Sequence, residues 1–148
     1  MTAHEDQLAL CLAIATRAHE GQVDKAGEPY IDHPVRVSGR CATEVQKAAA
    51  LLHDVIEDTP LTADDLRIEG VADEVVRIVL MLTHDKGTDY MDYVRTVSLD
   101  PDARAVKMAD LEDNMDLSRL PNPTEKDLER TEKYRRAHAI LETACGRS

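Results

Sequence analysis

Apolar residues recur at intervals of three or four along most of this chain, and no segment alternates strictly between apolar and polar residues. Side chains three and four positions apart share one face of a helix, whereas a half-buried strand needs a period of two. The pattern therefore predicts a fold made of helices alone. Its clearest example is the first series, which Gly21 ends: Leu8, Cys11, Leu12, Ala15 and Ala18.

We expect seven or eight helices, packed as one bundle in a single domain that spans residues 1–148. Gly27 and Pro29 predict a loop over residues 21–33. The most apolar helix is expected over 44–56, at the centre of the bundle, because its run AAALL is apolar on most sides. The remaining helices are expected to begin at Pro34, Thr62, Val75, Thr88, Pro101 (ending near 118) and Thr124 (ending near 145).

Composition limits the partners of this fold. The chain has no Trp and no Phe, so aliphatic side chains must fill its core. Its 18 basic and 29 acidic residues give a net charge of −11, which argues against nucleic acid and against anionic membranes. The three cysteines are far apart, and we find neither a signal peptide nor an apolar run long enough to span a membrane. We therefore expect a cytoplasmic protein.

Polar residues interrupt the most apolar helix. His53 and Asp54 follow directly on AAALL, and Glu57 and Asp58 come four positions later. Positions four apart share a helix face, so one imidazole and three carboxylates are expected in one region. Three carboxylates would repel one another unless a cation lay among them, and a divalent metal accepts this mixture of nitrogen and oxygen ligands. The alternative is a solvated acidic helix end with one satisfied histidine.

Two further segments carry polar residues at positions suited to the same site. In PYIDHP, His33 lies between a loop and a helix start, where its imidazole could reach a metal or simply cap the helix. In VKMADLEDN, Asp110 interrupts an apolar series and shares a helix face with Asn114, four residues later. The alternative for Asp110 is an ordinary exposed carboxylate.

The segments GEPYIDHP, LLHDVIEDT and VKMADLEDN occur in the order and approximate spacing of one known family. Over residues 18–117 the chain resembles the hydrolase domain of the RelA/SpoT enzymes, within the HD-domain superfamily of metal-dependent phosphohydrolases. In size it is similar to their small single-domain relatives, such as the metazoan SpoT homologue. The resemblance implies an all-α HD-domain bundle and an enzyme that removes the 3′-diphosphate from guanosine tetra- or pentaphosphate, or acts on a related small phosphorylated nucleotide.

The resemblance also assigns roles to individual residues. It implies a divalent metal, usually Mn²⁺, and a carboxylate beside the attacking water. Metal-bound water loses a proton more readily, and a carboxylate can accept that proton. The implied metal ligands are His33, His53, Asp54 and Asp110; the implied catalytic residues are Glu57 and Asp58; the implied substrate-binding residues are Asn114 and Lys25.

The chain departs from the family pattern beside the expected substrate. Asp24 stands where an arginine is common, and the usual RLHNMRTL is replaced by LEDNMDLS, which puts Asp116 and Leu117 in place of an arginine and a threonine. These changes remove positive charge, so a phosphatase of another small nucleotide or metabolite is a second hypothesis. A non-catalytic metal- or nucleotide-binding module is a third. The last helix could form a homodimer interface or cap the bundle.

Overall fold

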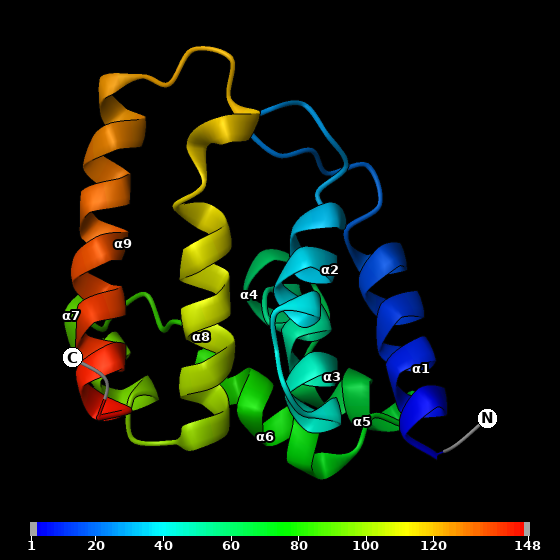
Figure 1. The fold of residues 1–148 in the computed structure, drawn as a ribbon. Coiled ribbons are helices and arrows are strands. Elements are labelled where there is room, and N and C mark those ends of the chain that lie inside the picture. Colours follow the sequence, from blue (N-terminus) through cyan, green and yellow to red (C-terminus); the bar gives the residue numbers. More distant parts are fainter. Residues whose placement is uncertain (1–2, 147–148) are drawn as a thin grey trace.

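The computed structural model describes residues 3–146, and these residues form nine α-helices and one 3₁₀ turn, with no strand among them (Figure 1). The all-α prediction is confirmed. The number of helices exceeds the expected seven or eight because the helix predicted over 44–56 is divided into α3 and α4. The elements are α1 (Ala3–Ala18), α2 (Asp32–Gly39), α3 (Glu44–Leu52), α4 (Val55–Asp58), α5 (Ala63–Ile68), α6 (Asp73–Leu82), α7 (Tyr90–Val97), α8 (Pro101–Asn114), η1 (Leu117–Arg119) and α9 (Glu125–Ala144).

Helix α3 is the centre of the bundle, as its composition predicts. It packs against α1, α2, α6 and α8, and every residue from Ala48 to Leu52 is buried. Alanine side chains let neighbouring helices approach closely, while leucine and valine side chains fill the space between them. The functional side chains that adjoin α3 are therefore carried on a rigid core.

Side-chain caps mark the starts of several helices. Thr62 and Thr124 each form a capping box with the aspartate three residues later, and Pro101 opens α8 behind the capping Asp100. The expectation that Thr88 caps α7 is wrong, because the Asp89 side chain accepts hydrogen bonds from the first-turn amides. Helix α8 ends at Asn114 instead of continuing to 118, and η1 follows it.

The expected continuous helix over 44–56 is interrupted. The α3 hydrogen bonding ends at Leu52, and α4 begins at Val55. In an uninterrupted helix the Ala50 carbonyl would accept from the Asp54 amide. Here Nδ1 of His53 donates to that carbonyl at 2.6 Å. The imidazole therefore replaces the Asp54 amide as the hydrogen-bond donor to Ala50. His53 and Asp54 therefore lie in a turn, at the junction of two helices.

Helix α9 lies along α8 and also packs against α7, so it covers one side of the bundle (Figure 1). At one end of the molecule the loop between α1 and α2 lies near the η1 turn (Figure 1), and residues of both segments line the same pocket. Within residues 3–146, no helix combines the length and the apolar character that crossing a bilayer requires.

Candidate metal centre and adjoining pocket

The four side chains predicted as metal ligands meet at one place. His33 comes from the first turn of α2, His53 and Asp54 from the turn after α3, and Asp110 from the middle of α8. Nε2 of His33 lies 2.9 Å from Oδ1 of Asp110 and 4.0 Å from Oδ2 of Asp54. Nε2 of His53 lies 3.1 Å from the same Asp54 oxygen and 3.3 Å from the same Asp110 oxygen. Three helices that pack on one another thus bring residues up to 77 positions apart into contact.

The nitrogen atoms of this cluster are oriented as metal ligands require. His53 donates from Nδ1 to the Ala50 carbonyl, which leaves Nε2 as the nitrogen that faces Asp54 and Asp110. That Nε2 is buried and has no partner in hydrogen-bond geometry among the described residues, despite the nearby carboxylates. His33 donates from Nδ1 to Asp113, 2.7 Å away, so its Nε2 also faces the cluster. A carboxylate or carbonyl behind each imidazole is typical of metal-bound histidine.

The spacing of the donor atoms also fits a metal. One ligand atom each from His33, His53 and Asp54 lie within 4.8 Å of one another, and Oδ1 of Asp110 adjoins both imidazoles. Adjacent ligands around an octahedral ion lie about 3 Å apart when each bond is about 2.1 Å long. Two imidazoles and two carboxylates suit a divalent transition metal. The residues present therefore fit the divalent metal that the sequence implies.

The imidazoles and carboxylates of the cluster stabilise one another's charged forms. Burial alone would lower the pKa of His53, but Asp54 and Asp110 raise it well above its ordinary value. Burial likewise opposes ionisation of Asp54, yet His53 holds the pKa of this carboxyl at about 2. The surroundings thus favour a positive charge on the imidazole of His53 and a negative charge on the carboxylate of Asp54. Metal binding must displace protons from the imidazoles.

Lys107 is a largely enclosed cation that was not among the predicted site residues. Its Nζ donates to Oδ2 of Asp110 at 3.0 Å and lies 5.3 Å from the centre of the Tyr93 ring. Burial alone would lower the pKa of Lys107, but Asp110 raises it well above its ordinary value. The signal was available, because Lys107 lies three residues before Asp110 and so shares its helix face.

Tyr30 and Asp113 also escaped the sequence analysis. The Tyr30 hydroxyl donates to Oδ2 of Asp54, and its ring lies between the rings of His19 and His33. Asp113 accepts from His33. Tyr30 stands within the quoted PYIDHP segment, and Asp113 lies three residues after Asp110, on the same helix face.

The predicted catalytic carboxylates lie beside the cluster rather than in it. Glu57 and Asp58 are exposed at the end of α4, and no hydrogen bond or ion pair within residues 3–146 joins either carboxylate to the four clustered residues. Glu57 accepts from the His84 amide at 2.7 Å, which ties α4 to the loop after α6. Burial and the neighbouring charge of Asp54 raise the pKa of Asp58, so Asp58 lies within electrostatic reach of the cluster.

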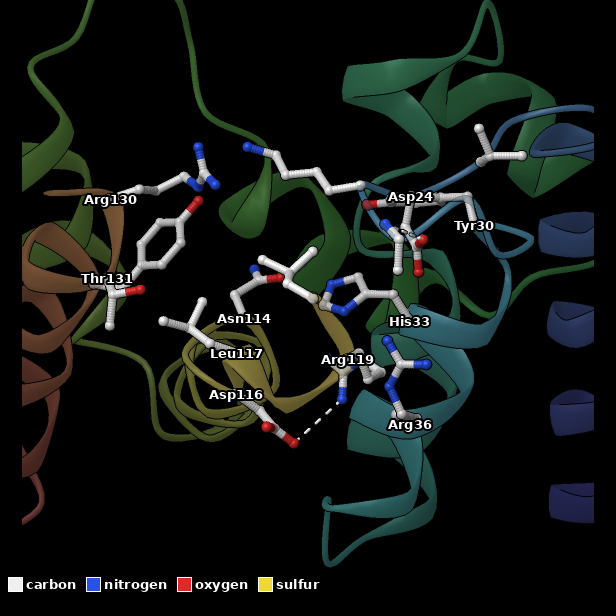
Figure 2. A pocket seen from close by; sticks show the side chains of 15 residues that line it. Asp24, Tyr30, His33, Arg36, Asn114, Asp116, Leu117, Arg119, Arg130 and Thr131 are labelled. Atoms are coloured by element: carbon white, nitrogen blue, oxygen red, sulfur yellow. Dashed lines mark hydrogen bonds and ion pairs between the residues drawn. The ribbon is translucent and has the colours of Figure 1, made fainter. Parts of the chain in front are cut away.

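A pocket of about 490 Å³ opens beside His33, and both predicted substrate-binding residues line it. Figure 2 shows Asn114 and Leu117 in its middle, His33 and Tyr30 on one side, and Arg130 with Thr131 on the other. Asn114 also donates to Oδ1 of Asp110 at 3.1 Å, which connects the pocket to the cluster. Lys25 lines the pocket from the loop before α2.

Each of the three arginines that line this pocket is paired with an aspartate. Arg119 donates to Asp116, Arg130 donates to Asp127, and Arg36 donates to Asp113. Lys25 is the one lining cation for which the described residues show no ion pair. Asp24 also lines the pocket, and its carboxylate accepts hydrogen bonds from the amides of Ala26 and Glu28 in the same loop.

Comparisons with known proteins agree with this geometry. A family model described as "HD domain" matches residues 11–113, a range that contains all four clustered residues. The Escherichia coli bifunctional (p)ppGpp synthase/hydrolase SpoT is 49% identical over 71 residues, which are 42% of this chain and 10% of that protein. This chain thus spans about a tenth of the length of that bacterial relative.

Two shorter relatives match more of their length. The guanosine-3′,5′-bis(diphosphate) 3′-pyrophosphohydrolase MESH1 of Homo sapiens is 35% identical over 70% of this chain and 65% of that protein. Its Mus musculus counterpart is 34% identical over 86% of this chain and 78% of that protein. A solved structure described as a metazoan ortholog of SpoT that hydrolyzes ppGpp superposes with a TM-score of 0.75, at 26% identity, over 97% of this chain and 86% of that one.

Proposed function

Since this chain belongs to the HD-domain family, we propose that it is a metal-dependent phosphohydrolase, and that it removes the 3′-diphosphate of guanosine tetraphosphate or of a related phosphorylated nucleotide. One observation carries the proposal: two buried imidazoles and two carboxylates converge on one point, and one of them, His33, also lines a pocket of about 490 Å³. Buried polar groups so arranged are costly unless they bind something. The relatives supply the class of substrate.

We assign His33, His53, Asp54 and Asp110 as the ligands of a divalent metal, with Mn²⁺ as the expected ion. When bound there, the metal would lower the pKa of a coordinated water and offset the negative charge that develops on the phosphoryl group. Tyr30 donates a hydrogen bond to Oδ2 of Asp54, the oxygen that faces the two histidines, and Lys107 donates to Oδ2 of Asp110, the oxygen that faces away from them. These bonds fix which carboxylate oxygen each residue presents.

The attacking water needs a proton acceptor, and we assign this role to Asp58 assisted by Glu57. Burial and neighbouring carboxylates raise the pKa of Asp58, which improves it as a base. The water oxygen forms a bond to the phosphorus attached to the 3′-oxygen, and the bond between that phosphorus and the 3′-oxygen breaks. The 3′-oxygen leaves with the electron pair and takes up a proton, and pyrophosphate is released.

The pocket beside His33 is the proposed site of the nucleoside and its 5′-phosphates. Lys25 and Arg130 lie on its walls, and Asn114 reaches from the pocket to Asp110. Phosphate groups favour such positions because lysine and arginine form charge-assisted hydrogen bonds with them.

A second candidate is a phosphatase acting on a nucleotide that carries fewer phosphates. The observation in its favour is that Arg36, Arg119 and Arg130 are each already paired with an aspartate. A ligand with many negative charges must either displace these aspartates or share their arginines.

The test is to incubate the Mn²⁺-loaded protein with guanosine tetraphosphate and with nucleotides that carry single phosphates, and to measure pyrophosphate and orthophosphate separately. Pyrophosphate from the first substrate supports the main proposal, and orthophosphate from the others alone supports the second. Asp54→Ala should abolish either activity, whereas Asp64→Ala, at an exposed position on α5, should retain it. Release of neither product, with the parent and Asp54→Ala proteins alike, would leave only a binding module.

A further inference from the structure

Asp113 is a buried carboxylate that the proposed reaction does not use directly. It lies on α8, and its side chain is 1% exposed. An unpaired carboxylate in such a place is strongly unfavourable, so the partners of Asp113 indicate its role. Burial alone would raise the pKa of Asp113, yet hydrogen bonds from His33 and Arg36 hold it well below its ordinary value. Asp113 is therefore held between His33 and Arg36, directly behind the candidate metal centre.

Three side chains converge on this carboxylate from two elements, α2 and η1. His33 of α2 lies with Nδ1 2.7 Å from Oδ2. Arg36, one turn later on α2, donates from Nε to Oδ1 at 2.8 Å and from Nη2 to Oδ2 at 3.1 Å. Arg119 of η1 donates to the Asp113 carbonyl at 3.0 Å and places Nη2 3.5 Å from Oδ2. The two-pronged contact with Arg36 fixes the plane of the carboxylate, which a single hydrogen bond would not do.

The two histidines of the cluster are held in different ways. The Nδ1 of His53 donates to the Ala50 carbonyl, which belongs to its own helix. The Nδ1 of His33 has no such backbone partner and depends on a side chain 80 residues away in sequence. The orientation of His53 thus follows from local backbone structure, while that of His33 requires Asp113.

We propose that Asp113 is a positioning residue that fixes the tautomer and ring orientation of His33, and that Arg36 and Arg119 hold the Asp113 carboxylate for this purpose. The proposal rests on the proposed metal centre. With Nδ1 donating to Asp113, Nε2 is the nitrogen that faces Asp110, 2.9 Å away, and Nε2 is therefore the atom that can bind a metal once its proton has left. Arg36 and Arg119 also line the pocket, so the same two guanidinium groups border both the ligand space and the support of a metal ligand.

The test is Mn²⁺ affinity, measured by titration calorimetry on the full chain for the parent, Asp113→Ala and Asp113→Asn proteins. Loss of a supporting carboxylate behind a metal-bound histidine weakens binding by about 10- to 100-fold, which is the expectation for Asp113→Ala. Asp113→Asn should fall between, because its amide oxygen can still accept from Nδ1 but carries no charge. Asp113→Asn also keeps the shape of the site and serves if Asp113→Ala does not fold.

A spectroscopic measurement separates positioning from general structural support. In the Zn²⁺-loaded parent protein, the Nδ1 proton of His33 should give a slowly exchanging downfield resonance with a ¹⁵N shift typical of a protonated Nδ1. Asp113→Ala should lose that resonance, while the corresponding His53 resonance persists. The matched control is Asp100→Asn, which removes a charge from the other end of α8, where Asp100 pairs with Arg77. It should change neither the Mn²⁺ affinity nor the His33 resonance.

The outcomes distinguish this inference from the proposed function. If His33→Ala and Asp54→Ala lose Mn²⁺ binding but both Asp113 variants bind as tightly as the parent, the positioning role is wrong and the metal centre stands. If His33→Ala and Asp54→Ala also bind Mn²⁺ like the parent, the metal centre is wrong and the role of Asp113 falls with it. Retention of the His33 resonance in Asp113→Ala would equally overturn the positioning role.

Discussion

The ion pair between Lys107 and Asp110 offers a quantitative test of how charge is balanced in the candidate metal centre. The two side chains are 13% and 7% exposed, and Nζ lies 3.0 Å from Oδ2. At this distance unit charges attract by roughly 5 kcal/mol for an effective dielectric constant of about 20. Lys107→Met keeps most of the side-chain volume and removes the charge. It therefore leaves Asp110 as a buried carboxylate with one cation fewer.

The expected loss of stability is smaller than the gross attraction. Asp110 keeps contacts with His33, His53 and Asn114, and the variant no longer has to desolvate an ammonium group. Breaking a buried pair by removing one partner typically costs about 3–5 kcal/mol, so we expect about 2–4 kcal/mol for Lys107→Met without metal. In a domain of this size that corresponds to a fall in Tm of about 5–15 °C.

Urea denaturation with chelator and with saturating Mn²⁺ provides the assay. A bound divalent cation supplies part of the lost positive charge, so the stability difference between Lys107→Met and the parent should shrink by about 1 kcal/mol or more with Mn²⁺. The control is Lys133→Met, because Lys133 is exposed and lies 4.1 Å from the centre of the Tyr90 ring. It should cost less than about 1 kcal/mol with or without metal. A Lys107→Met protein as stable as the parent in chelator would refute the reasoning.

Three further predictions follow from the same contacts. Tyr30→Phe removes the hydrogen bond to Asp54 and should lower kcat by about 3- to 10-fold, because one hydrogen bond contributes about 1 kcal/mol; an unchanged kcat in steady-state assays would show that Asp54 needs no such support. Lys25→Ala should raise KM by about 10-fold while leaving Tm unchanged, since Lys25 lines the pocket without an ion pair within the described part of the chain; a change in kcat alone would place Lys25 elsewhere in the reaction. The apparent affinity for Mn²⁺ should keep rising as the pH increases above 6.5, because Asp54 and Asp110 outweigh burial and raise the pKa of His53 well above that ordinary value, and its proton must leave before Nε2 can bind metal; affinity that calorimetry finds flat above pH 6.5 would contradict the assignment of His53 as a ligand.

Local sequence rules account for most of the helices. Periodicity located the buried face of α1 and the central position of α3, and threonine caps located the starts of α5 and α9. The rules failed where a side chain competes with the backbone. At His53 the imidazole takes the Ala50 carbonyl and divides one expected helix into two. Asp89 displaced Thr88 as the cap of α7, since both residues can accept from first-turn amides and only the final packing selects one.

The sequence by itself predicted which residues make up the candidate metal centre, because polar side chains interrupt apolar helical series within recognisable motifs. Those residues were His33, His53, Asp54 and Asp110, and the structure brings them into contact. The supporting partner of His33 was decided only by the tertiary structure. Asp113 meets His33 across 80 residues because α2 packs against α8. No local pattern encodes such a contact, because hydrogen bonds between distant segments depend on how whole helices pack.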